Sequence, residues 1–129
     1  MSPEIKKRMS DFLTLSNANE LIRISADSLV YVASDGNYSD IRTRDGETRT
    51  VTVQLGIIEE LILRQFKSDE NECVRIGKSL IVNLRFVHLI NPTRKQIVLS
   101  DNHTFKFSLE ASKEALRQLK DYFDNYSEQ

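Results

Sequence analysis

The sequence has 129 residues, of which 40% are apolar, and a formal net charge of −1. This length is enough for one compact domain with a core, and the charge excludes a globally basic, histone-like DNA binder. No apolar run is long enough to predict a membrane span, and the charged N-terminus lacks the apolar segment of a secretory signal, so we expect a cytoplasmic protein.

The first 19 residues are expected to form a helical or linker segment. Apolar residues recur there at close to helical spacing: Ile5, Met9, Phe12 and Leu13. Residues 16–19 look like a break, so we place the main domain at residues 20–129.

Residues 21–53 have the pattern of an antiparallel meander. Short runs rich in β-branched and aromatic residues alternate with turns, and Asp45-Gly46 is a strong hairpin signal. The expected strands cover residues 21–24, 29–33, 38–43 and 48–53. An amphipathic helix is then predicted over residues 55–66, with its apolar stripe packed on the core.

Residues 74–83 begin like a strand, and Gly77 interrupts the pattern. A glycine at such a place marks a bulge, a turn or a close backbone approach. Two cations, a hydroxyl and an amide stand beside it: Arg75, Lys78, Ser79 and Asn83. These groups suit contacts with phosphates and base edges. Residues 74–100 contain no Asp or Glu, which favours one cationic face, with chance segregation of a solvated surface as the alternative.

The C-terminal part predicts a strand over residues 86–90 and a hairpin formed by residues 96–99 and 104–107. Ser108 is expected to be the N-cap of a last helix, with Glu110 in its first turn. Together these patterns predict a mostly β, α+β domain of antiparallel strands with two helices.

Signatures of catalysis and of metal or cofactor binding are missing from the sequence. His88 and His103 have no acidic or cysteine companions at ligand spacing, and no phosphate-binding glycine loop occurs. Cys73, the single cysteine, excludes an internal disulfide and fits a reducing compartment, and without a nearby His it is weak evidence for a nucleophile. We therefore expect no enzyme, no metal and no cofactor.

The order of these motifs resembles the LytTR family of bacterial DNA-binding domains. The resemblance runs from Leu21 to about Tyr122 and is carried by the Gly36-Asn37-Tyr38 turn and by Arg75-x-x-x-Ser79-x-x-Val82-Asn83. It implies an elongated antiparallel β-sandwich whose inter-strand loops enter successive major grooves of double-stranded DNA. Members usually serve as output domains of two-component response regulators, behind a receiver domain, so an upstream receiver domain or kinase system is implied as well.

By motif position, the resemblance implies DNA contacts at the turn of residues 36–39, at residues 75–79 and at residues 108–110. With neighbouring cations, the candidate DNA-binding residues are Asn37, Tyr38, Ser39, Arg75, Lys78, Ser79, Lys106, Ser108 and Lys113. The chain departs from the family at two positions. Most members have a His in place of Gly77, and many have an Arg in place of Glu110, where Lys113 would have to compensate.

Several candidates have a structural alternative. Arg75 can be a strut that bonds a carbonyl or a DNA contact, Tyr38 can pack on the sheet, and Asn83 is expected to bond turn backbone. Arg94 and Lys95 are expected to be solvated surface. Four phosphate contacts, from Arg75, Lys78, Lys106 and Lys113, would give a salt slope of roughly −4.

The sequence thus predicts a sequence-specific DNA-binding transcriptional regulator. The alternative is a protein-interaction module on the same fold with weakened or lost DNA binding, supported by Gly77, Glu110 and the near-zero net charge. Useful specificity would need two copies on a repeated site. The apolar stripe of residues 5–13 offers a surface for a homodimer, with packing on its own domain as the alternative.

Overall fold

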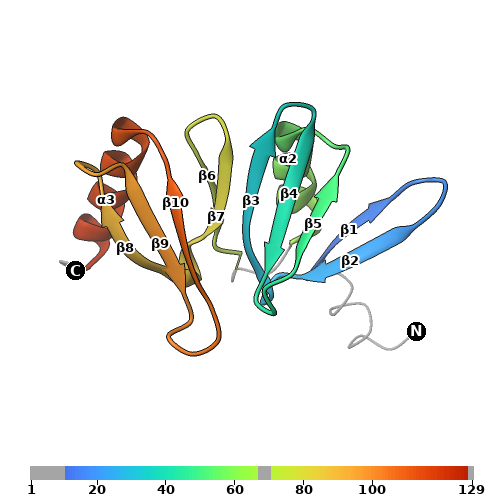
Figure 1. The fold of residues 1–129 in the computed structure, drawn as a ribbon, viewed down its shortest axis with the longest axis horizontal. Coiled ribbons are helices and arrows are strands. Elements are labelled where there is room, and N and C mark those ends of the chain that lie inside the picture. The colour runs from blue at the N-terminus through green and yellow to red at the C-terminus, as the bar shows by residue number, and fades with distance from the viewer. Residues whose placement is uncertain (1–10, 67–70, 128–129) are drawn as a thin grey trace.

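A computed structural model of the chain describes residues 11–66 and 71–127. These residues form three antiparallel sheets, two α-helices and a short 3₁₀ turn (Figure 1). The first two sheets contain β1 (Phe12–Ser16), β2 (Leu21–Ser25), β3 (Leu29–Asp35), β4 (Tyr38–Thr43), β5 (Thr48–Val51), β6 (Cys73–Ile76) and β7 (Leu80–Asn83). The third contains β8 (Val87–Asn91), β9 (Gln96–Ser100) and β10 (Lys106–Glu110); the helical elements are α2 (Leu55–Gln65), η1 (Leu84–Phe86) and α3 (Lys113–Ser127). The predicted mostly β fold with two helices is confirmed.

The N-terminal hairpin corrects one expectation. Residues 12–16 form strand β1, not the second half of a helix, and β1 pairs along its whole length with β2. Leu13 and Leu15 are buried because alternate residues of β1 face the core. The described residues before Glu20 are therefore part of the packed body, and the predicted break at residues 16–19 is the turn of the hairpin. The part of the expected helical segment over residues 1–10 lies outside the described residues, and so do Ile5 and Met9 of the proposed pairing stripe. Leu13 of that stripe is fully buried in the core of its own domain.

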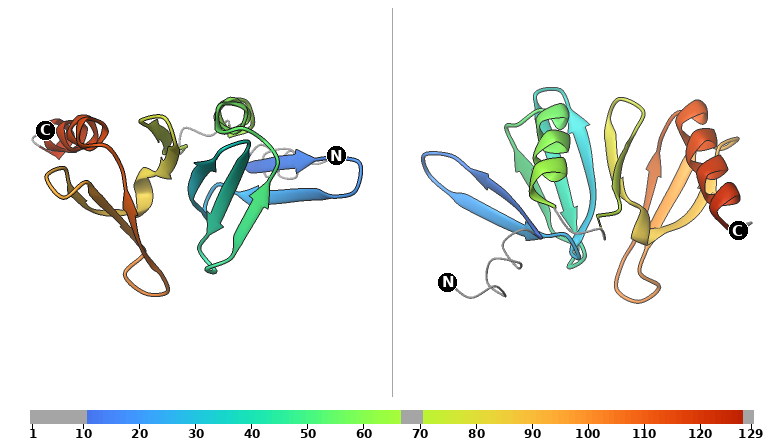
Figure 2. Two further views of the ribbon diagram at one scale, coloured as in Figure 1. Left: turned by 45° about the horizontal axis from the view of Figure 1, so that its top comes forward. Right: turned by 180° about the vertical axis from the view of Figure 1, so that it is seen from behind.

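The central sheet has the strand order β5-β4-β3-β7-β6. The hairpin predicted at Asp45-Gly46 is confirmed as the β4–β5 connection, where Gly46 adopts the left-handed region. The predicted helix is α2, whose buried residues Ile58 and Ile62 pack on one face of this sheet together with β1. Figure 2 shows α2 and α3 on the same side of the molecule.

The third sheet, in the order β10-β9-β8, packs with α3 and with the other face of the central sheet. An aromatic cluster joins the two sheets: Tyr31 of β3 meets Phe107 edge-on with ring centroids 5.8 Å apart, and Phe107 stacks on Phe105. The guanidinium of Arg42 lies 4.8 Å above the Phe107 ring and adds a cation–π contact. Figure 1 shows the three sheets in a row along the long axis of the molecule.

The start of the last helix differs from the prediction. Ser108 lies within β10, whereas α3 begins at Lys113 and is capped by Ser112, whose hydroxyl oxygen accepts a hydrogen bond from Ala115 N–H at 3.2 Å. Strand β10 continues to Glu110 because its partner β9 extends to Gln96 opposite it. In the part of the chain that the structure describes, no helix is long and apolar enough to span a membrane.

Candidate nucleic-acid interface

Two of the predicted contact turns lie at the same end of the central sheet. Strands β3 and β7 are antiparallel neighbours, and Ala33 near the end of β3 pairs with Leu80 at the start of β7. The β3–β4 turn, residues 36–37, and the β6–β7 turn, residues 77–79, therefore project from the same end of the sheet. The N–H of Ser34 donates to the carbonyl oxygen of Ser79 at 2.8 Å, which ties the two turns together.

The connection between β10 and α3 joins this edge. A β-carbon added at Gly77 would lie 3.6 Å from Ala115 Cβ and 4.0 Å from Ser112 Oγ, so the start of α3 contacts the β6–β7 turn. The N–H of Ala111 donates to the carbonyl oxygen of Lys95, which brings in the β8–β9 turn as well. We call the combined surface of residues 36–38, 77–79, 92–95 and 110–114 the turn edge; its segments follow one another along the top of Figure 1.

The two central turns present polar and cationic tips to solvent. Asn37, Lys78 and Ser79 are exposed, and Tyr38 is 50% exposed, so its ring is not packed into the sheet. The Lys78 ammonium forms no ion pair with any described residue. These groups supply cationic, amide and phenol donors at exposed hairpin tips, a combination suited to phosphates and base edges.

Arg75 is engaged within the protein. Its Nη1 lies 3.2 Å from Glu59 Oε1 on α2, and its Nη2 donates to the carbonyl oxygen of Lys78 at 2.8 Å. The strut interpretation of Arg75 therefore describes the contacts that this side chain makes. Its neighbour in the motif, Asn83, is buried and bonds backbone on both sides of its amide, as predicted: the amide nitrogen donates to the carbonyl of Leu29 and the oxygen accepts from the N–H of Arg85.

Two of the candidate DNA contacts lie away from the exposed tips of the turn edge. Ser39 is fully buried, and its hydroxyl donates to the carbonyl oxygen of Val53 at 2.6 Å, so it holds the connection between β5 and α2 and does not face solvent. Lys106 is exposed but pairs with Ser100 at the far end of β10, away from the turn edge. Strand register decides both outcomes, because the period of two sends Ser39 inward and the strand direction carries Lys106 away.

The remaining candidates, Ser108 and Lys113, differ in position. Ser108 is exposed in the middle of β10, where its hydroxyl oxygen accepts a hydrogen bond from Gln96 Nε2 at 3.0 Å. Lys113 is exposed at the first residue of α3, on the turn edge itself. Of the two, Lys113 is the one that lies on the turn edge.

The turn edge also contains two cations that the sequence interpretation assigned to solvated surface. Arg94 and Lys95 lie in the β8–β9 turn, which Lys95 closes with a positive φ of 56°. Three exposed carboxylates lie on or directly beside the edge: Asp35, at the end of β3, and Glu110 and Glu114. In the sequence, the absence of Asp and Glu from residues 74–100 was the signal that could have placed Arg94 and Lys95 on a cationic surface. Their actual position depends on the pairing of β8, β9 and β10, which is not visible in the sequence.

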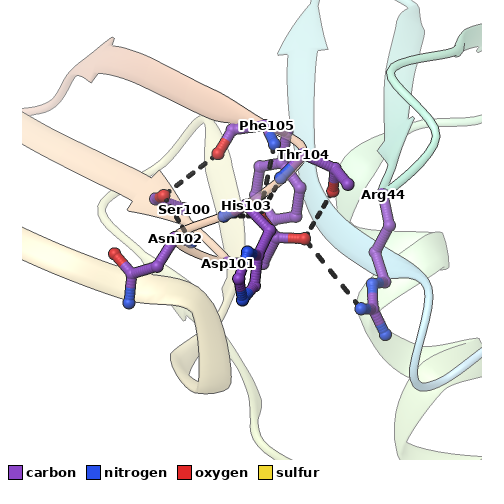
Figure 3. A network of polar contacts seen from close by, with 7 residues as sticks. All are labelled: Arg44, Ser100, Asp101, Asn102, His103, Thr104 and Phe105. Atoms are coloured by element: carbon purple, nitrogen blue, oxygen red, sulfur yellow. Dashed lines mark hydrogen bonds and ion pairs between the residues drawn. The ribbon is translucent and has the colours of Figure 1, made fainter.

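At the opposite end of the third sheet, the β9–β10 loop is held by a network of polar contacts. In Figure 3, Asp101 accepts hydrogen bonds from the backbone N–H groups of His103, Thr104 and Phe105 and from the Thr104 hydroxyl, and it lies 4.0 Å from Arg44. The Thr104 hydroxyl, followed by these N–H groups, holds the pKa of the Asp101 carboxyl well below its usual range. This network fixes the β9–β10 loop and connects it to Arg44, the residue that follows β4.

Two observations bear on metal-binding and nucleophilic side chains among the described residues. No group of three or more His, Cys, Asp and Glu side chains is placed to hold a metal ion within residues 11–66 and 71–127. Burial, reinforced by Glu72, raises the pKa of the Cys73 thiol to about 12, which suppresses the thiolate at neutral pH.

Comparisons with known proteins agree with this geometry. The family model described as the LytTr DNA-binding domain matches residues 19–124. Among solved structures, the fold is similar to the LytTr DNA-binding domain of a Bacillus cereus protein described as a methyl-accepting/DNA response regulator. The TM-score is 0.58 and the identity 18%, and the match covers 86% of this chain and 94% of that chain, which supports the fold. No curated protein matches the sequence. Because the family model covers most of its length, this chain belongs to the LytTr DNA-binding domain family.

Proposed function

We propose that this chain is a sequence-specific transcriptional regulator that lays its turn edge along a DNA duplex. The observation that carries the proposal is that turns from separate hairpins, with Lys78 exposed at one tip and Lys113 at the next segment, lie on a single edge. A major groove admits a two-stranded β-ribbon, so a row of hairpin tips can enter successive grooves from one side.

The residues of the edge are assigned two tasks, and Lys78 takes part in both. Asn37, Tyr38, Lys78 and Ser79 sit at the tips, where a base edge can be reached, and are the proposed specificity contacts. Four cations are proposed to neutralise phosphates: Lys78, Arg94, Lys95 and Lys113. About four such contacts give a salt slope of roughly −3.6 at ~0.9 per contact. A monomer with so few contacts binds modestly, so we propose that two copies act on a repeated site, downstream of a receiver domain or kinase system.

The test uses a duplex that the protein itself selects from a random-sequence pool. Binding is measured by fluorescence anisotropy between 50 and 300 mM salt for the wild type, Lys78→Ala and Lys106→Ala. We expect Lys78→Ala to weaken binding and to reduce the salt slope by about 0.9, because one phosphate contact is lost. Lys106→Ala is the matched control, since this exposed lysine lies at the other end of β10, and we expect it to bind like the wild type.

One observation favours the alternative, a protein-interaction module on the same fold. Asp35, Glu110 and Glu114 place three carboxylates among the cations of the turn edge, which suits a partner of mixed charge better than a polyanion. A wild-type protein that selects no duplex and shows no salt-sensitive binding at 50 mM salt would favour this module and overturn the DNA-binding proposal.

A further inference from the structure

The β6–β7 turn is held from below by a side chain of its own hairpin. Arg75 of β6 donates through Nη2 to the carbonyl oxygen of Lys78, three residues along the chain. Lys78 is the residue whose ammonium we place on DNA, so the guanidinium fixes the backbone that carries this contact. The turn needs such support because Gly77 adopts a left-handed φ of 62° and glycine gives the backbone more freedom than any other residue.

The second donor of the same guanidinium connects the turn to α2. Arg75 Nη1 lies 3.2 Å from Glu59 Oε1, and both side chains are partly shielded, at 29% and 39% exposure. The helix that carries Glu59 is anchored by Ile58, which is fully buried beside it. Gly56, one turn earlier, lies beside the guanidinium, since a β-carbon there would make an ordinary contact with Nη1 at 3.6 Å. The turn is therefore linked to the core through two bonds of one planar group.

This arrangement also reduces the electrostatic attraction between Arg75 and DNA. Glu59 compensates the guanidinium within the protein, so Arg75 contributes little net attraction to a phosphate. The resemblance implies a DNA contact at Arg75, whereas its two contacts here both point into the protein.

We infer that Arg75 is a positioning residue for DNA binding, and that the Glu59–Arg75 ion pair sets how rigidly the β6–β7 turn presents Lys78. The inference rests on the proposed function and adds α2 to the machinery of the turn edge. It separates two roles for cations of one hairpin: Lys78 touches the duplex, and Arg75 holds the backbone of Lys78.

Paired carboxylate variants on α2 give the sharpest test. Glu59→Gln and Glu60→Gln each remove one negative charge from adjacent positions, but Glu60 is exposed and forms no ion pair with any described residue. A general charge effect raises the affinity of both variants for the selected duplex, because repulsion of DNA falls. A positioning role predicts opposite signs: Glu60→Gln binds as well as or slightly better than the wild type, and Glu59→Gln binds about threefold more weakly with an unchanged salt slope.

A second variant and a second readout exclude a simple loss of stability. Arg75→Lys keeps the charge but cannot bond Glu59 and the Lys78 carbonyl as a planar fork, so we expect weakened binding with an unchanged salt slope. Hydrogen exchange of the amides of residues 77–79, measured without DNA, should be faster in Glu59→Gln and Arg75→Lys while exchange in β3 and α3 stays as in the wild type.

The outcomes separate the inference from the proposed function. If the wild type binds the duplex but Glu59→Gln binds as tightly as Glu60→Gln, or if Arg75→Lys retains wild-type affinity, the positioning role is overturned. Unchanged exchange at residues 77–79 in both variants also overturns it, because the strut then holds nothing. Failure of the wild type to bind any duplex is a different result, which refutes the proposed function itself.

Discussion

Replacing Asn83 by alanine tests the structural half of the central motif. The Asn83 side chain is 4% exposed, and its amide nitrogen donates to the carbonyl oxygens of Leu29 at 2.8 Å and Ala26 at 3.3 Å. Its amide oxygen accepts from Arg85 N–H at 3.1 Å and caps the 3₁₀ turn. Each such bond contributes about 1 kcal/mol net, and a buried group left without a partner costs about 1–3 kcal/mol. We therefore expect Asn83→Ala to lower the free energy of unfolding by about 3 kcal/mol.

The measurement is urea denaturation followed by far-UV circular dichroism, with Asn37→Ala as the matched control. Asn37 is an exposed asparagine of the turn edge, so its removal should leave the urea midpoint unchanged and weaken binding to the selected duplex. Asn83→Ala should show the reverse: a large drop in midpoint, and wild-type affinity under conditions where it is folded. A loss of less than about 0.5 kcal/mol in Asn83→Ala would refute the reasoning, because three hydrogen bonds would then be worth less than one ordinary bond.

Two further predictions concern backbone and pH. Gly77→Ala should destabilise the fold by about 1 kcal/mol, because φ is +62° there. Gly56→Ala should stabilise the fold by about 0.5 kcal/mol, because an added β-carbon in this helix meets only an ordinary contact at 3.6 Å. Equal urea midpoints for the two variants would contradict this prediction. The Thr104 hydroxyl and loop N–H groups lower the pKa of Asp101, so its stabilisation is fully present above the unfolded pKa of about 3.9 and is lost as the pH falls toward the lower folded value. The urea midpoint of the wild type should therefore exceed that of Asp101→Asn most at pH 6, and the gap should narrow from pH 4 to pH 2; a gap independent of pH would exclude the mechanism.

Local patterns predicted those parts of the fold that depend on neighbouring residues. Asp45-Gly46 carries its own turn chemistry, and the apolar repeat of α2 specifies a helix that needs only one face of a sheet to pack against. Asn83 was predicted to be structural for a similar reason, because an amide that ends a strand can bond nearby turn backbone, although its partners Leu29 and Ala26 come from distant residues.

The strand β1 shows where such patterns fail. Met9, Phe12 and Leu13 fit a helical period, but Leu13 and Leu15 also fit a period of two, and the choice between them is made by pairing with β2. A hairpin supplies backbone hydrogen bonds to both strands and buries their alternate residues against α2, which outweighs the weak helical preference of a short segment. The same dependence on pairing explains why Ser108 lies in a strand: Gln96–Ser100 provides a partner as far as Glu110.

The sequence predicted which turns form hairpin tips, but not which neighbouring side chains share a surface with them. A glycine between two strand patterns indicates a hairpin turn, so Asn37 and Lys78, which directly follow Gly36 and Gly77, could be placed at hairpin tips from the sequence alone. Whether a neighbouring side chain reaches the same surface depends on register, which sends Ser39 into the core, and on strand direction. Lys106 begins β10 and Lys113 follows its end, so the length of the strand separates them. Neither quantity is encoded locally.

The two departures from the family pattern are connected by the structure. Gly77 faces the start of α3 at Ala115, and Glu110 ends the strand that leads into the same helix. A carboxylate at this point repels a duplex, but Lys95 and Lys113 flank the β10–α3 connection and carry the opposite charge. On the proposed arrangement, the third segment of the turn edge therefore supplies phosphate attraction from the residues beside the strand end. Base recognition is then left to the two central turns, and the rigidity of the β6–β7 turn becomes the property that most affects specificity.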